Sequence, residues 1–190
     1  MVGDGLFGVS TCGSVSIGGS SATGGKGKAP DKKGEKPGTV ERRPTCEGYP
    51  VTPEEILGLP KGALQKYYTN ECPADGYRGL LYTDRDCDVT GAGIYICHNK
   101  WGTAELTNFH GEFRGLIIAD RVTKVNGNGK VIGGIITLSD LQGSNKFGNG
   151  NARIKYSSSV FNKLDEYCSN LEAAVEVTEI SWRELLPGSY

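Results

Sequence analysis

Alternating carboxylates are the first candidate for chemistry in this sequence. Asp84, Asp86 and Asp88 follow one another with a single residue between them, and carboxylate oxygens in such a run are ligands that Ca²⁺ prefers. The EF-hand calcium loop would also require glycine and glutamate where the chain has Val89 and Tyr95. The run is therefore a candidate calcium site outside the EF-hand pattern, with an exposed acidic turn as the alternative.

A second group of carboxylates follows short apolar runs that we expect to form strands. Asp84, Asp120 and Asp140 each follow a short apolar run, and His98 follows the run between the first two. If these runs stack, the side chains form a ladder on one face. Enzymes that act on polysaccharides use paired carboxylates, one with a raised pKa. The alternative is that the acids mark a solvated corner of the fold.

Other catalytic and cofactor motifs are missing from the sequence. His98 and His110 are the only histidines, and neither has the spacing of a serine or cysteine triad or of a histidine metal site. The glycine-rich Gly24–Lys28 lacks the serine or threonine of a phosphate-binding loop. Apart from the candidate calcium run and the acidic ladder, the sequence therefore predicts no catalytic residue, resident metal or cofactor.

The cysteines indicate an oxidising compartment. Their number is even and no CxxC occurs, which argues for disulfides and against a thioredoxin-like motif or a zinc ribbon. Six cysteines allow fifteen pairings, and the sequence does not choose between them. The disulfide candidates are Cys12, Cys46, Cys72, Cys87, Cys97 and Cys168.

Charge and the chain's beginning restrict the partners. The chain has 21 basic and 22 acidic residues, whereas general nucleic-acid binders are strongly basic. No apolar run is long enough to span a membrane, and the first residues do not resemble a signal peptide. A cysteine pattern typical of secreted proteins without an export signal leads us to expect a targeting or anchoring segment upstream of Met1.

The glycine content and the spacing of apolar runs predict the fold. Glycine makes up 29 of 190 residues, which argues against a helical bundle. Runs beginning at Leu116, Ile135 and Ile154 are each separated by 19 residues, and a constant period near 20 is typical of a solenoid. We expect a mainly β protein built as a parallel β-helix, with glycine and asparagine at the corners of each coil. An antiparallel β-sandwich with a hairpin at 126–129 is the alternative.

Four segments follow from this reading. They are an N-terminal β segment over 1–24, a basic loop with a short helical insertion over 25–75, β-helix coils over 76–158, and a capping helix with a C-terminal strand over 159–190. The helix is expected over 160–171 and the strand over 173–182. The expected core residues are Leu81, Ile94, Ile96, Leu116, Ile118, Val131, Ile135, Thr137 or Ile136, and Ile154.

Several stretches resemble PilX-type pilus-assembly proteins, which are minor-pilin-like bacterial proteins with a glycine-rich ectodomain. The stretches that carry the resemblance are Leu6-Phe7-Gly8, Phe113 to Asp120, Val125 to Ile136, Gly148-Asn-Gly150 with Ile154 to Ser158, and Ile180-Ser-Trp-Arg-Glu184. The resemblance covers roughly residues 1–20 and 76–185.

This resemblance implies a structural protein rather than an enzyme. It would be the ectodomain of a minor pilin in the cell envelope, on the periplasmic face of the inner membrane or on the pilus. Its partners would be other pilins, and an N-terminal helix absent from this chain would hold it in the membrane. The alternatives are a polysaccharide-binding or polysaccharide-degrading β-helix protein and a bactofilin-like scaffold that polymerises with itself.

Overall fold

The computed structural model describes residues 50–107, 109–122, 125–138 and 151–168, together with Gly48 and the backbone of six short strands outside these ranges. The strands are β1 (Val9–Thr11), β2 (Val15–Ile17), β3 (Ala22–Gly24), β4 (Val40–Arg42), β5 (Tyr77–Thr83), β6 (Gly91–Cys97), β7 (Glu105–Leu106), β8 (Glu112–Ala119), β9 (Arg121–Val122), β10 (Asn126–Gly127), β11 (Lys130–Thr137), β12 (Asn145–Phe147), β13 (Asn149–Gly150) and β14 (Arg153–Tyr156). The helices are α1 (Pro53–Leu57), the 3₁₀ helix η1 (Gln65–Tyr67), α2 (Ser158–Phe161) and α3 (Leu164–Tyr167).

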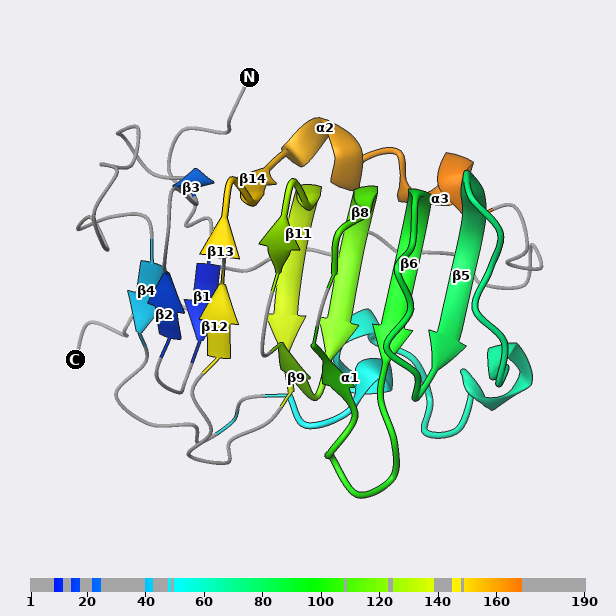
Figure 1. The fold of residues 1–190 in the computed structure, drawn as a ribbon. Helices are drawn as coiled ribbons and strands as arrows, with labels where there is room; N and C mark the ends of the chain where they lie inside the picture. The colour runs from blue at the N-terminus through cyan, green and yellow to red at the C-terminus, as the bar shows by residue number, and fades with distance from the viewer. Residues whose placement is uncertain are drawn as a thin grey trace.

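One parallel sheet dominates the molecule (Figure 1). Its strands lie in the order β3-β14-β11-β8-β6-β5, so the chain adds one strand per coil from β5 to β14. The N-terminal β3 then pairs with β14 at the opposite edge from β5. Each pair in this sheet is parallel, which confirms the expected solenoid and excludes the antiparallel sandwich.

The segments that connect these strands also stack on one another. β7 pairs with β9, Phe109 bridges to Val125, and β10 pairs with β13, all in parallel. The Asn-Gly pair of β10 therefore belongs to a stacked coil rather than to the hairpin of the alternative fold.

The coils differ in length, and the two equal 19-residue intervals are not kept. Leu80 pairs with Ile94 and Ile94 with Leu116, so the first two repeats have the 14 and 22 residues that separate these apolar runs in the sequence. Leu116 pairs with Gly134 and Val131 with Ile154, so the next two repeats have 18 and 23 residues in place of 19 and 19. Ile135 is paired with Ile117, one position away from the alignment that the sequence suggested. Insertions in the connecting loops absorb these differences, because only the strands must keep register.

The inner face of the sheet packs against the interior of the solenoid. Its buried residues include Tyr95, Phe113, Ile117 and, in the returning segments, Phe109 and Leu106, each no more than 1% exposed. Side chains alternate between the two faces of a strand. Four of the expected core residues lie on this face: Leu81, Val131, Ile135 and Ile154.

The outer face is buried as well, beneath the helices. Its cluster includes residues that we expected in the interior of the coil but that point away from it. This correction has a simple cause: when both faces of a strand are buried, alternation of apolar and polar residues no longer identifies the inner one. The relocated residues are Ile94, Ile96, Leu116 and Ile118; Thr137 is buried and Ile136 packs partly buried against the outer cluster.

The helices cover this outer face rather than the end of the solenoid. In place of the one helix expected over 160–171, α2 packs on β8 and β11 and α3 packs on β6. Figure 1 shows α2 and α3 near the start of the long strands and α1 near their ends. Residues 68–69 lie beside the end of β5, where Tyr68 bridges to Tyr82. The strand expected over 173–182 lies outside the described residues.

A column of glycines runs across the middle of the sheet. Gly79, Gly93, Gly115 and Gly133 are paired in register on four consecutive strands, with φ between 136° and 149°. Residues with a Cβ rarely adopt this backbone conformation. These glycines therefore lie within strands, whereas we expected glycine mainly at the corners of the coils.

Candidate functional site

The candidate site lies where the long strands end. The residues that directly follow β5, β6, β8 and β11 are Asp84, His98, Asp120 and Leu138. The backbone ladder continues through this row, because His98 N–H donates to Thr83 and Asp120 N–H to Cys97. The structure thus places Asp84, His98 and Asp120 on successive coils. Leu138 takes the next place, and Asp140 lies outside the described residues.

Asp120 is the centre of this row. Its side chain is 1% exposed, and its Oδ1 lies 2.5 Å from Nδ1 of His98. Its other oxygen, Oδ2, accepts hydrogen bonds from the backbone N–H of Asn99 at 3.1 Å and of Ala104 at 2.9 Å. A carboxylate removed from water is stable only with such partners. Asp120 therefore joins its own strand end to both ends of the loop that follows β6.

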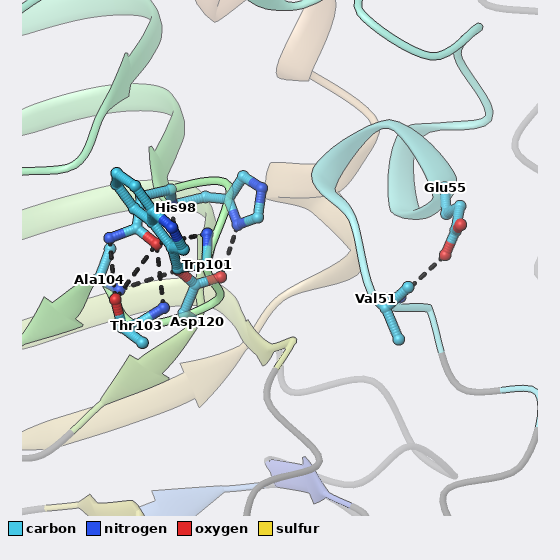
Figure 2. A network of polar contacts seen from close by, with 8 residues as sticks. Val51, Glu55, His98, Trp101, Thr103, Ala104 and Asp120 are labelled. Atoms are coloured by element: carbon cyan, nitrogen blue, oxygen red, sulfur yellow. Dashed lines mark hydrogen bonds and ion pairs between the residues drawn. The ribbon is translucent and has the colours of Figure 1, made fainter.

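The loop after β6 is organised by Asn99. Its Oδ1 accepts hydrogen bonds from the backbone N–H of Trp101 at 3.0 Å and of Thr103 at 3.1 Å. Figure 2 shows this loop with His98 and Asp120 at its base. Trp101 is 70% exposed, and the Lys100 ammonium lies 4.5 Å from the centre of its indole ring. The loop thus holds one aromatic side chain out in solvent.

The His98–Asp120 pair has one clear chemical capacity. A carboxylate at Nδ1 orients the imidazole and stabilises the tautomer with its proton on that nitrogen, which leaves Nε2 as an acceptor. The ring is 12% exposed and stacks on Tyr82 with centroids 6.2 Å apart. Burial raises the pKa of Tyr82 to about 12, so its hydroxyl remains protonated at neutral pH. The pair is an oriented imidazole within a packed environment.

Figure 2 also shows a separate polar contact at the start of α1. Thr52 accepts a hydrogen bond from the backbone of Glu55 at 3.2 Å, and Glu55 in turn accepts from the N–H of Val51 at 2.8 Å. This arrangement is similar to a capping box, with Glu55 closing back on the residue before the N-cap, and it satisfies free amides at the helix start. Ile56 and Leu57 of α1 pack partly buried against the outer cluster.

The three candidate calcium ligands have separate partners. Asp86 accepts a hydrogen bond from the Thr107 hydroxyl on the next coil. Asp88 accepts from the backbone N–H groups of His110 at 2.6 Å and Gly111 at 2.8 Å. Asp84 lies by Tyr68, whose pKa is raised by burial and by this carboxylate. Within the described ranges, no group of three or more histidine, cysteine or acidic side chains is placed to hold a metal ion.

The cysteines divide into a disulfide and two buried thiols. Cys72 and Cys87 are bonded, and Cys12 and Cys46 lie outside the described residues. Cys97 and Cys168 are free, so the expectation that they pair is wrong for these two. Cys97 points into the interior of the solenoid whereas Cys168 packs in the outer cluster, and the sheet separates them. Burial raises the pKa of both thiols, to about 12 and about 11.

Sequence reasoning missed the Asn99 loop and the glycine column. The glycines do have a sequence signal, because Gly79, Gly93 and Gly115 each stand directly before an apolar run and Gly133 stands one residue further ahead of one. The loop also has one, since asparagine favours turns by bonding the backbone two residues on. The bond from Asp120 to the N–H of Ala104 has no local signal, because it depends on the register between coils.

The fold and the site together define a parallel β-solenoid whose acidic side chains connect successive coils. No protein-family model matches the chain, and neither a curated protein nor a solved structure is significantly similar to it. Among the described residues, the structure contains no helix with the length and apolar character needed to cross a membrane.

Proposed function

We propose that this chain is a structural protein without enzymatic activity, whose solenoid presents a rigid surface for assembly with other proteins. The supporting observation is that its carboxylates bind groups of the protein itself. Asp120 accepts three hydrogen bonds, while Asp86 and Asp88 bind groups on the following coil. A glycosidase needs two carboxyl groups that face the same substrate bond, whereas these carboxylates face the protein's own chain.

The more specific role is that of a pilus-assembly ectodomain in the cell envelope. It is supported by the resemblance of residues 1–20 and 76–185 to PilX-type proteins and by the disulfide between Cys72 and Cys87, since such bonds persist in oxidising compartments. The pilus-assembly role predicts that the complete gene encodes an apolar, prepilin-like helix ahead of Met1. It also predicts that the chain binds purified pilins of the same organism.

The experiment that tests the structural role replaces Asp120 by asparagine. Because hydrogen bonds to a charged group contribute about 1.5–3 kcal/mol each, we expect Asp120→Asn to lower the free energy of unfolding by about 2 kcal/mol. Urea denaturation followed by circular dichroism measures this. A panel of acidic and neutral polysaccharides, assayed for new reducing ends and for unsaturated products, should show no turnover by the unmodified chain.

Glu71→Gln is the matched control, since it removes one negative charge from an exposed residue outside the sheet. We expect its stability to stay within about 0.5 kcal/mol of the unmodified chain. The proposal fails if the unmodified chain cleaves a polysaccharide and Asp120→Asn abolishes that cleavage while leaving stability intact. Filaments formed by the chain alone would instead favour the self-polymerising scaffold, and sedimentation velocity over a concentration series distinguishes this outcome.

A further inference from the structure

Basic side chains form a regular row where the long strands begin. In the register of the sheet, Arg78, Ala92, Arg114, Ile132 and Lys155 occupy the same position on five consecutive strands. Neighbouring strands lie about 4.8 Å apart. The three cations are therefore spaced two strands apart, about 10 Å, with a small or apolar side chain between each pair.

A second row lies two residues earlier on three of these strands. Glu112, Lys130 and Arg153 are paired in register. The Lys130 ammonium lies 3.0 Å from Glu112 and the Arg114 guanidinium 3.5 Å from it, and the Lys130 bond lowers the pKa of Glu112. We call the five cations of the two rows the basic stripe: Arg78, Arg114, Lys130, Arg153 and Lys155.

The basic stripe is a local excess of positive charge on a neutral protein. Its two rows carry five cations against the single carboxylate Glu112, whereas the whole chain has a net charge of −1. Asp75, just before β5, is engaged by the hydroxyl of Thr90 at 3.0 Å. The stripe is therefore a local concentration of positive charge where the strands of the outer face begin.

The helices leave the stripe accessible. α2 and α3 pack on the apolar residues of the outer face, which begin two residues after the row of Arg78 and Arg114 on each strand. Figure 1 shows the two helices beside the starts of the long strands. Arg114 is 53% exposed and Lys130 is 33% exposed. The Arg78 guanidinium lies 5.4 Å from the ring centre of Tyr167 in α3, which holds it in place at the end of the row.

We propose that the basic stripe binds a linear anionic polysaccharide, with the sugar chain lying across the strands. The order of side chains carries this inference. Arg78, Arg114 and Lys155 would pair with acidic groups on the polymer, while the partly exposed Ile132 between Arg114 and Lys155 offers apolar contact to the carbon–hydrogen face of a sugar. Ala92, which is 4% exposed, only separates Arg78 from Arg114. This site goes beyond the structural role and does not depend on it.

The shape of the stripe favours a polymer over a lipid surface. Arg78, Arg114 and Lys155 follow one line along the direction in which the strands stack, with Lys130 and Arg153 in a second line beside part of it. The neighbouring helices stand on the same face. A bilayer presents anions in two dimensions and is recognised by clusters of basic residues that meet a plane. A linear polyanion instead presents its charges in a row, which is the arrangement found here.

The test measures binding of polyuronate oligosaccharides by isothermal titration calorimetry on the full chain. The stripe variant combines Arg78→Gln, Arg114→Gln and Lys155→Gln. Its control combines Lys61→Gln, Arg85→Gln and Lys100→Gln, which removes the same charge from exposed positions away from the strand starts. We expect the unmodified chain and the control to bind alike, and the stripe variant, which loses three exposed ion pairs, to bind roughly tenfold more weakly. Raising the salt concentration should weaken binding by the unmodified chain.

Three outcomes would overturn the proposal. They are no binding of the polyuronate by the unmodified chain, equal loss of affinity in the two triple variants, and equal affinity for a neutral oligosaccharide of the same length. Binding to phosphatidylserine vesicles without binding to polyuronate would show that the stripe recognises lipid and would also refute it. Circular dichroism checks that the variants fold, and the single change Lys155→Gln, at an exposed side chain, provides the same comparison should the triple variant unfold.

Discussion

The two faces of the long sheet are both buried, yet they are built in different ways. On the inner face, the glycine column brings strand backbones into contact with one another. A Cβ on Gly115 would overlap the carbonyl group of Gly93, and one on Gly133 would overlap that of Gly115. On the outer face, contacts are made by side chains, such as those of the helices against Leu116 and Ile118.

This difference shows which parts of the solenoid can accept change. Backbone atoms cannot move without shifting a whole coil, whereas a side chain can change its rotamer. The inner face therefore determines the stacking of the coils, and the outer face determines what covers them.

A methyl group on each face gives the most direct contrast. Gly115→Ala places a Cβ against the Gly93 backbone at a residue with φ of 149°, whereas a Cβ on Gly134 meets the ring of Phe161 at 2.9 Å. We expect Gly115→Ala to cost about 4 kcal/mol, combining backbone strain with overpacking. Gly134→Ala should cost about 1 kcal/mol or less, because the Phe161 ring can move.

Urea denaturation of both variants measures these losses. Equal effects of the two substitutions would show that the inner face is no more rigid than the outer one. Gly62→Ala, at a turn whose added Cβ has open space around it, shows how much a positive φ costs by itself.

Truncation of neighbouring isoleucines tests whether the outer layer is a true core. Ile117 faces the interior and Ile118 faces the helices, and both are fully buried. We therefore expect Ile117→Ala and Ile118→Ala each to cost about 3 kcal/mol, as measured by thermal or urea unfolding. A cost below about 1 kcal/mol for Ile118→Ala would mean that the helices do not stay on the sheet in solution.

The disulfide links the inner core to the segment beside β5. Cys87 is buried in the inner cluster, and Cys72 follows the residues that bridge to Tyr82. The bond joins residues 15 apart, and closing a loop of that length stabilises a fold by about 3 kcal/mol. We expect the double variant Cys72→Ser, Cys87→Ser to lose about that amount, and reduction of the unmodified chain to have the same effect in urea denaturation.

Alkaline pH tests the burial of the two free thiols. Burial raises the pKa of Cys97 to about 12 from an ordinary value of 9.0, so the folded chain keeps a proton that the unfolded chain loses. The contribution of this thiol to the free energy of unfolding is complete below pH 9, declines above that pH and is lost as the pH passes 12. By pH 10 we expect a loss of about 1 kcal/mol.

Urea denaturation at several pH values checks this slope, and Cys97→Ala should make it shallower between pH 9 and 12. Cys168 on the outer face has a pKa of about 11, so its contribution should end at a lower pH. Rapid alkylation of Cys97 by iodoacetamide at pH 8, in the folded chain, would contradict its burial.

Much of this architecture could be predicted from local sequence. Apolar runs led by glycine predicted parallel coils, because such runs recur along the chain and must stack to bury themselves. The direction of each side chain could not be predicted. Tyr95 and Ile96 are both completely buried, so nothing in their polarity distinguishes the inner face from the outer one.

Of the candidate site, only the row of residues that directly follow the strands could be predicted from the sequence. Asp84, His98 and Asp120 follow strands directly, and so their placement comes from counting along the chain. Asp140 does not share that relation, since Leu138 follows the strand of its coil. The bonds from Asp120 to the Asn99 loop depend on coils of unequal length, and a single sequence does not determine that register.

The central claim is that Asp120 connects neighbouring coils as a structural residue. Native-state hydrogen exchange tests it most directly, through the backbone N–H groups of Asn99 and Ala104, which donate to this carboxylate. We predict that both amides exchange slowly in the unmodified chain and that Asp120→Ala accelerates them at least about tenfold while the amides of β8 stay protected. Fast exchange of the two amides in the unmodified chain, or no change in the variant, would contradict the claim.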